Sequence, residues 1–387
     1  MAVLYYMRIL LLGDASNYHN CLAKGLVNLG HDVVVASNGS TWMGTHRDID
    51  LDRHIPGKVG GAILAARIKW LMMSGRLSGY DVVQIGTPFF VTQRPQRLKW
   101  IFDFIRRNNR LVLNSAYGAE PYWIDYCLDR GGMRYNEWRI GSGPGPLAVS
   151  SPDLMTSWNT PEMRHYNDYV FSRFDGAVSA LWEYNEEMLR HFPAEKVAYA
   201  GIPIDVDSLS LRPEIDSIPG KVRIFLGVHR DRMVEKGTDR MLAAVKKVVE
   251  RYPDKCELTY VESVPYKDYV GMMRSSHVIL DQLYSYTPAT NAMLAMAQGI
   301  VAVTGAEPEF YDFIDEHDNR PIINAVPDDE ALFRTFEDIV LHPERIPAQS
   351  RASRDFVATH NHLDVVSRRF LDFWAKGLSK PPFPNIC

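Results

Sequence analysis

The stretch from Val278 to Thr304 constrains the fold of this chain most strongly. It reads VILDQLYSYTPATNAMLAMAQGIVAVT. An apolar run ends at Asp281, a polar loop follows, apolar residues recur at helical spacing over about 292–297, and a second apolar run begins after Gly299. Two short buried runs around a helical period predict strand, loop, helix and strand. Such a unit belongs to an α/β domain with a mainly parallel sheet.

The entrance of the predicted helix carries two start signals, Thr287-Pro288 and Thr290-Asn291. A hydroxyl cap or a first-turn proline favours a helix N-terminus at either place. This N-terminus would follow a buried strand, where free N–H groups and the helix dipole favour an anion such as phosphate. The alternative is an ordinary α/β unit that binds no ligand.

The same alternation of strands and helices recurs along the whole chain and predicts two domains. The chain has 387 residues, of which 46% are hydrophobic and 23% charged, as in soluble globular proteins. We expect a first Rossmann-like domain at 1–200, a linker at 201–220 and a second Rossmann-like domain at 221–360. A C-terminal helix and a proline-containing tail complete the chain at 361–387, and the helix is expected to cross back to the first domain.

Composition and motifs exclude several classes of protein. The formal net charge of −4 argues against a nucleic-acid binder. The turn after the first strand, Gly13 to Asn17, lacks G-x-G-x-x-G, so a nicotinamide cofactor is not expected. The four cysteines form no C-x-x-C pair, which predicts neither a zinc site nor a disulfide framework and fits a cytoplasmic location. Alternating acids at 48–52 are interpreted as a solvated edge rather than as a metal site.

Residues 92–110 form a predicted basic helix with six Lys or Arg residues and one opposing acid, Asp103. A basic amphipathic helix can lie on an anionic membrane, which would place the protein peripherally at the inner face of the membrane. The alternative is a surface helix that packs its apolar side on a sheet. No apolar run is long enough to span a bilayer.

Two further features point to ligands. Residues 116–164 are irregular and rich in aromatics, including Tyr117, Tyr122 and Trp123. Such a loop suits a carbohydrate or another flat ligand. The alternative is that the aromatic side chains pack beneath the loop and fill its base.

Arg230 and Lys236 bracket the loop between a strand and a helix of the second domain, where two cations could neutralise a diphosphate.

Taken together, these segments resemble the GT-B glycosyltransferases, in particular the retaining family 4. MRILLLGDASNYHNCLAKGLVNLGHDVVVAS is similar to the family's first strand, helix and Gly-His turn, and 201–205 is similar to its linker entry. The second domain carries the most specific motifs. Arg230 and Lys236 have the spacing of the family's pyrophosphate-binding pair, 295–299 resembles its AMA-x-G helix, and Glu309 matches the glutamate of its Pro-Glu segment.

The sequence departs from the family at its two glutamates, which lie eight positions apart and bind the donor sugar and the ribose. Tyr286 and Leu294 occupy these positions. A leucine cannot accept a hydrogen bond, so other groups must bind the donor or nucleotide recognition is altered. The family's first-domain histidine is replaced by Tyr117-Gly118, and His19, Glu120 and Asp125 remain as speculative polar groups near the reaction centre.

The resemblance implies a metal-independent hexosyltransferase without a cofactor, which moves a sugar from a nucleotide-diphosphate donor to a glycan or lipid-linked glycan acceptor. The donor would be bound by Gly13, Arg230, Lys236, Tyr286, Thr287, Thr290, Asn291 and Glu309, and the acceptor by Asn17, Tyr117, Tyr122 and Trp123. Catalytic residues are unknown, with Glu120 and His19 as speculative candidates. A sugar-nucleotide epimerase of the same fold and a catalytically inactive GT-B partner subunit are the alternatives.

Overall fold

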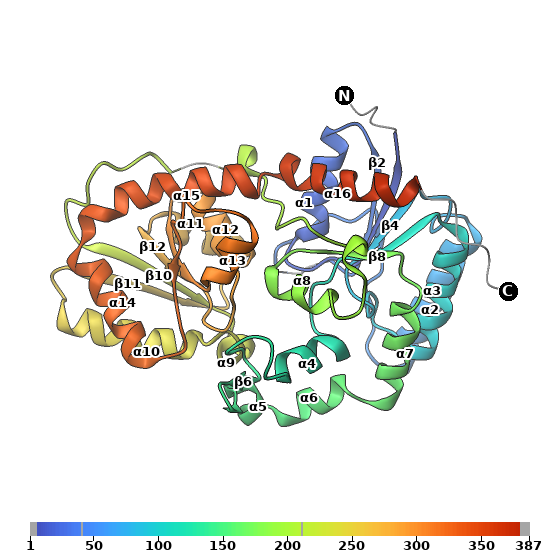
Figure 1. Cartoon of the computed structure of the whole chain (residues 1–387), viewed down its shortest axis with the longest axis horizontal. Coiled ribbons are helices and arrows are strands. Elements are labelled where there is room, and N and C mark those ends of the chain that lie inside the picture. Colours follow the sequence, from blue (N-terminus) through green and yellow to red (C-terminus); the bar gives the residue numbers. More distant parts are fainter. Residues whose placement is uncertain (1–5, 40–41, 210–211, 380–387) are drawn as a thin grey trace. The chain divides into compact units, whose positions relative to one another are not determined.

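The computed structural model describes residues 6–39, 42–209 and 212–379, and the chain divides into two compact units. The first unit comprises the residues up to 126, 156–203 and the residues from 363 onward. The second comprises 127–155 and 204–362. Each unit has its own parallel sheet (Figure 1). The expected proline-containing tail lies outside the described residues.

The sheet of the first unit has the strand order β3-β2-β1-β4-β5-β8-β9. The strands are β1 (Arg8–Leu12), β2 (Asp32–Ser37), β3 (Ile49–Asp50), β4 (Val82–Ile85), β5 (Leu111–Asn114), β8 (Gly176–Ser179) and β9 (Val197–Tyr199). All neighbouring pairs are parallel, with Leu10 opposite Val34 on one side and Val83 on the other. The central strands are largely buried and mostly apolar because helices cover both faces of the sheet, and Gln84 and Asn114 are buried polar exceptions.

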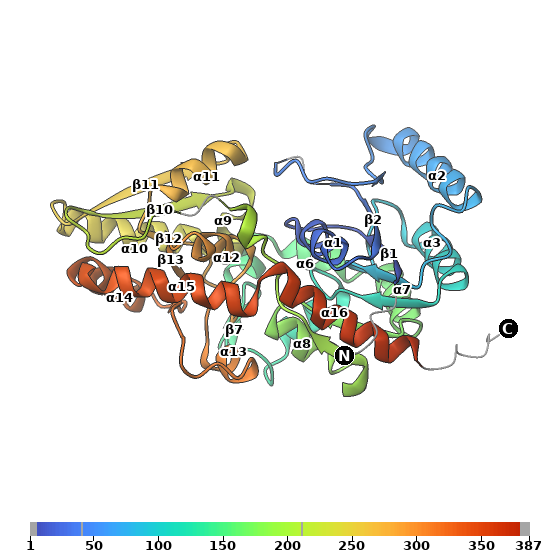
Figure 2. The same cartoon turned by 90° about the horizontal axis from the view of Figure 1, so that it is seen from above.

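Two layers of helices enclose this sheet. The first unit contains α1 (Tyr18–Asn28), α2 (Gly57–Met73), α3 (Pro95–Asn108), α7 (Pro161–Phe171), α8 (Trp182–Met188) and α16 (Leu363–Leu378). Figure 2 shows α1 beside α16, and α2 beside α3. The C-terminal helix therefore returns to the first unit as expected, and its Trp374 Nε1 donates to Gln84 Oε1 of β4 at 3.1 Å.

The second unit has a five-stranded parallel sheet with the order β11-β10-β12-β13-β14. The strands are β10 (Val222–Val228), β11 (Cys256–Glu262), β12 (Val278–Leu280), β13 (Val301–Thr304) and β14 (Ile323–Asn324). The helices are α9 (Met233–Lys236), α10 (Thr238–Arg251), α11 (Tyr266–Arg274), α12 (Thr290–Ala297), α13 (Pro308–Phe313), α14 (Asp329–Leu341) and α15 (Ile346–His360). The stretch 278–304 is strand, loop, helix and strand, as the sequence predicts.

The irregular region after β5 contains more structure than the sequence indicated. It forms α4 (Pro121–Leu128), a two-stranded hairpin of β6 (Arg139–Ile140) and β7 (Gly143–Pro144), α5 (Pro146–Ser150) and α6 (Pro152–Trp158). The expected bounds place all of it in the first domain. Residues 127–155 instead group with the second unit, because Ile140 packs against the second core and Tyr135 donates a hydrogen bond to Glu307.

Candidate functional site

The carboxyl edge of the second sheet carries the predicted phosphate site. β10 and β12 are parallel neighbours, so the loops after Val228 and Leu280 leave the same edge. Lys236 is the last residue of α9, and its Nζ lies 3.6 Å from Oδ1 of Asp281, the residue after β12. The Asp281 side chain is 1% exposed, whereas that of Lys236 is 25% exposed. Lys236 is therefore fixed at one end by a buried acid and still reaches solvent.

The first turn of α12 belongs to the same cluster. Asn291 Nδ2 donates to Asp281 Oδ1 at 2.9 Å, and Asn291 Oδ1 accepts from the Tyr269 hydroxyl at 2.9 Å. The residue before the helix is Ala289, which has no side chain that can cap the first-turn N–H groups. The cluster thus joins a cation to a helix N-terminus that lacks a side-chain cap, a combination that favours a bound anion.

The two predicted cations have different surroundings. Arg230 lies in a short 3-10 helix (Arg230–Arg232), and its Nε donates to Glu262 at the end of β11. Its side chain is 77% exposed. Arg230 and Lys236 therefore both lie at the carboxyl edge, but each pairs with its own acid, and only Lys236 is linked to the entrance of α12.

The remaining predicted donor residues are largely enclosed. Thr287 and Tyr286 are buried, and Thr290 opens α12. The Tyr286 hydroxyl accepts from the backbone N–H of Arg134. Glu309 accepts from the Arg134 guanidinium, whose second branch donates to Glu307 at 2.6 Å. The donor roles of these residues stay predictions, but Tyr286 and Glu309 are bonded to Arg134, which lies in 127–155, a segment that the sequence placed in the other domain.

Glu307 is a buried acid that sequence reasoning missed. It accepts hydrogen bonds from Arg134, from the Tyr135 hydroxyl at 2.5 Å and from Asn324 Nδ2 at 3.0 Å. The sequence signal that could have found Glu307 is its position directly after the buried run that ends at Ala306. On another side of the same unit α5 packs against α9, so 127–155 borders both Glu307 and the helix that ends in Lys236.

The carboxyl edge of the first sheet is closed by hydrogen bonds. His19 is fully buried, with Nδ1–H donating to the carbonyl of Gly13 and Nε2 accepting from Ser115 Oγ at 2.8 Å. Burial lowers the pKa of His19 to about 4, which matches this neutral tautomer. Burial raises the pKa of Asp14 to about 6, although its carboxylate accepts a hydrogen bond from the backbone N–H of His19 at 2.9 Å.

Tyr117 and Asn17 lie at this edge and make local contacts. The Tyr117 hydroxyl donates to the carbonyl of Gly13 at 3.4 Å, and its ring lies 5.4 Å from that of His19. Asn17 precedes α1 in the left-handed region with φ 66°, and its Oδ1 accepts from Asn20 at 2.8 Å. Their roles toward an acceptor, and that of Gly13 toward a donor, stay predictions.

Glu120 is a helix cap. Its carboxylate accepts from the N–H groups of Tyr122 at 2.9 Å and Trp123 at 2.7 Å, in the first turn of α4, and from Asn167 Nδ2 at 2.6 Å. Burial and the nearby Glu187 carboxylate raise its pKa to about 8. These contacts give Glu120 a structural task, and its speculative catalytic role stays a prediction.

The aromatic residues of α4 pack inside the first unit. Tyr122 stacks on His191 with ring centroids 3.8 Å apart, and its hydroxyl donates to Asp168 at 2.6 Å. Trp123 is buried, with its ring 4.4 Å from Tyr184. Asp125, named as a polar neighbour of the reaction centre, forms a bidentate ion pair with Arg164. These contacts fit the alternative that the aromatic side chains pack beneath the loop and fill its base. The acceptor-binding roles of Tyr122 and Trp123 stay predictions.

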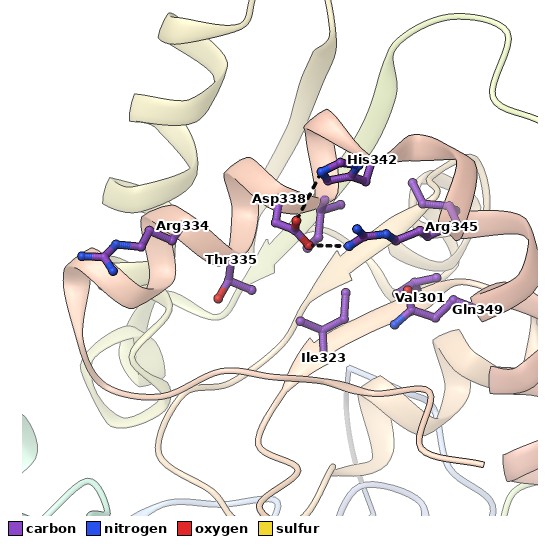
Figure 3. A pocket seen from close by; sticks show the side chains of 10 residues that line it. Val301, Ile323, Arg334, Thr335, Asp338, His342, Arg345 and Gln349 are labelled. Atoms are coloured by element: carbon purple, nitrogen blue, oxygen red, sulfur yellow. Dashed lines mark hydrogen bonds and ion pairs between the residues drawn. The ribbon is translucent and has the colours of Figure 1, made fainter. Parts of the chain in front are cut away.

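A cavity of about 540 Å³ lies at the opposite edge of the second sheet, where β13 and β14 begin (Figure 3). Its acid is already bonded: Arg345 Nη1 lies 3.0 Å from Asp338, and His342 Nε2 lies 3.7 Å from the same carboxylate. None of the predicted donor residues lines it. We therefore assign the candidate site to the Lys236 cluster rather than to this cavity.

Within residues 6–39, 42–209 and 212–379, no group of three or more His, Cys, Asp or Glu is arranged to hold a metal ion. Among the acids at 48–52, Asp50 pairs with Arg47 at 3.1 Å and with Arg67 at 3.3 Å. Desolvation raises the pKa of Asp50, but hydrogen bonds from Asp52 and His54 and the two arginines outweigh it, so the pKa is lowered. In the same part of the chain, no helix is long and apolar enough to cross a membrane.

Comparison with known proteins identifies the fold. No family model and no curated protein matches the sequence. Among solved structures, sucrose-phosphate synthase from Thermosynechococcus elongatus has a TM-score of 0.61 at 14% identity, covering 96% of this chain and 99% of that one. HepE of Anabaena in complex with UDP and glucose has a TM-score of 0.59 at 10% identity, covering 96% and 100%.

Two other similar structures extend the comparison. The UDP-GlcNAc 2-epimerase of Neisseria meningitidis, bound to UDP-GlcNAc, has a TM-score of 0.55 at 12% identity, covering 96% of this chain and 100% of that one. The TarM mutant of S. aureus has a TM-score of 0.52 at 8% identity, and this chain spans only 58% of its length. At these identities the similarity concerns the fold, and the chain has the GT-B fold of two Rossmann-like units.

Proposed function

We propose that the protein is a glycosyltransferase that transfers a sugar from a nucleotide-diphosphate donor to a glycan or lipid-linked glycan acceptor. The observation that carries the proposal is the cluster at the carboxyl edge of the second sheet. Lys236, fixed by buried Asp281, stands beside the uncapped first turn of α12. In open α/β sheets, ligands bind at this edge.

The proposed chemistry is electrostatic. When the bond between sugar and phosphate breaks, negative charge develops on the leaving diphosphate. Lys236 and the first-turn N–H groups of α12 stabilise this charge, with the exposed Arg230 as an outer cation. Fixed cations can thereby replace a bound metal, which makes the proposed reaction metal-independent. Membership of the retaining family 4 rests on the motif resemblance and belongs to the same proposal.

Recognition of the nucleoside and the sugar differs from the family pattern in this proposal. Tyr286 and Leu294 provide no carboxylate, so Thr287 and Thr290 are the nearest groups for the donor hydroxyls. Glu309 can contribute only together with Arg134, because their side chains are bonded. At the carboxyl edge of the first sheet, Gly13 is proposed to contact the donor, and Asn17 and Tyr117 are proposed to contact the acceptor.

Two alternatives follow from specific observations. The similarity to a UDP-GlcNAc 2-epimerase favours an enzyme that isomerises a nucleotide sugar without an acceptor. The missing carboxylates at 286 and 294 favour an inactive GT-B partner subunit.

A screen of nucleotide sugars separates these functions. Thermal stabilisation identifies the donor, and product analysis with and without glycan acceptors identifies the reaction. We expect one class of nucleotide sugar to stabilise the protein and to lose its sugar to an acceptor or slowly to water. Isomerisation without an acceptor would establish the epimerase, and absence of binding across the panel would establish the inactive subunit.

A further inference from the structure

Helix α2 is apolar on two opposite sides. One side belongs to the core of the first unit through Leu64, Ile68, Leu71 and Met72. The other side is open to solvent: Val59 is 66% exposed, Ile63 52%, Trp70 57% and Met73 79%. At 3.6 residues per turn, Val59, Ala62, Ile63, Ala66, Trp70 and Met73 fall on one stripe that spans an arc of about 100°. We call these six residues the α2 stripe.

The Lys and Arg residues of the segment that carries the α2 stripe have no acid among them in sequence. Residues 53–80 contain Arg53, Lys58, Arg67, Lys69 and Arg76 and no Asp or Glu. Arg67 is paired with Asp50 at 3.3 Å, whereas no ion pair involves Lys58 or Lys69 within the described residues. Lys58 and Lys69 follow the helical period along one border of the stripe, and Arg67 lies on the opposite border.

Packing explains why this helix, rather than α3, offers an apolar surface. In α3 the apolar residues Leu98, Ile101, Phe102 and Ile105 are buried in the core and only Trp100 is an exposed large apolar residue, at 44%. Membrane contact through 92–110 stays a prediction. The guanidinium of Arg97 donates to the carbonyl of Gly61 at 3.0 Å and so fastens α3 to α2. Figure 2 shows the two helices side by side, away from α1 and α16.

We propose that the α2 stripe is a docking surface for an anionic phospholipid membrane. An exposed apolar stripe with Trp and Met, bordered by lysines and free of acids, is the composition of a helix that lies in the plane of a bilayer interface. The apolar side chains enter the boundary between headgroups and acyl chains, while Lys58 and Lys69 reach lipid phosphates. A protein partner of ordinary surface composition offers no comparable match for the one-sided charge. The inference stands on α2 alone and does not depend on the proposed transferase activity.

Vesicle flotation with the full chain tests this assignment. The probes are vesicles of phosphatidylcholine alone and of phosphatidylcholine mixed with phosphatidylglycerol. We expect the protein to float with the anionic vesicles and to be released by salt. The double variant Ile63→Glu/Trp70→Glu should bind about tenfold more weakly or worse, because each change places an acid in the apolar stripe.

The matched control is Val27→Glu/Val149→Glu, which adds the same charge at exposed apolar positions of α1 and α5. This control should float like the unmodified protein, and circular dichroism should show both double variants folded. Failure of the unmodified protein to prefer anionic vesicles, or equal binding by the α2 variant, would overturn the proposal. Sedimentation that shows self-association lost in the α2 variant, without vesicle binding, would assign the stripe to a second copy of the chain instead.

Discussion

The carboxyl edges of the two sheets use similar elements in different ways. In the first unit, β1 and β5 end at an edge where His19 is neutral and bonded on both ring nitrogens. In the second unit, β10 and β12 end at an edge where Lys236 is held by Asp281 but remains partly exposed. The first edge is a closed polar network, and the second offers a partly exposed cation next to a helix N-terminus. This difference favours the second edge as the proposed anion site.

The largest expected effect concerns the acid that anchors 127–155 to the second unit. Glu307→Ala leaves the Tyr135 hydroxyl and Asn324 without their acceptor, and each such loss costs about 1–3 kcal/mol. Loss of the ion pair with Arg134 costs less stability, because the Arg134 side chain is 56% exposed. We expect the free energy of unfolding to fall by about 2–6 kcal/mol in denaturant titration.

Glu309→Ala is the control for this variant, because Glu309 is more exposed and shares only Arg134 with Glu307. It should cost clearly less stability. Equal effects of the two variants would show that the buried network around Glu307 does not anchor the segment.

The closed edge of the first unit predicts two opposite pH effects. His19 has a native pKa of about 4, below its usual 6.5, so the unfolded chain takes up a proton first and stability is lost as pH falls from 6.5 to 4. Asp14 has a native pKa of about 6, above 3.8, so the native state takes up a proton first and stability is gained as pH falls from 6 to 3.8. Each contribution amounts to about 3 kcal/mol at most.

Variants separate these opposing contributions. His19→Gln should make thermal stability less sensitive to acid between pH 6.5 and 4, and Asp14→Asn should make it more sensitive between pH 6 and 4. Melting temperatures measured across this range provide the check. The same direction of change in both variants would contradict the protonation states derived for this edge.

The smallest expected effects distinguish the two cations of the open edge. Lys236→Ala should weaken binding of the stabilising nucleotide sugar about tenfold, equivalent to about 1.4 kcal/mol. Arg230→Ala should weaken it less, because the Arg230 side chain is exposed and already paired with Glu262. Isothermal titration calorimetry measures both, with Val27→Glu, at an exposed position of α1 outside the predicted sites, as the variant that should bind normally. A larger loss in Arg230→Ala would reverse the ranking of the two cations.

Local pattern and recognisable motifs accounted for most of the fold. The strand, loop and helix at 278–297 follow from apolar periodicity and from the helix start at Thr290, because these signals depend only on neighbours in sequence. The basic pair was likewise visible, since its residues flank a single loop. The GT-B fold followed from the order of such units along the chain.

Contacts between distant segments could not be predicted in this way. Nothing local indicates that Arg134 bonds to Glu307, that Asn291 is occupied by Asp281 and Tyr269, or that Asn167 donates to Glu120. Whether a polar side chain serves a ligand or the fold depends on which partners the packing brings to it. Exposure of the α2 stripe is decided the same way, because both sides of that helix are apolar in sequence and only tertiary packing buries one of them.

The sequence by itself thus determined two α/β units and a cationic loop in the second. Tertiary structure decided which partners the predicted site residues have, placed 127–155 in the second unit and left one apolar helix side in solvent. The physical reason is that secondary structure follows from short-range periodicity, whereas the state of a side chain depends on burial and on partners that the fold brings together.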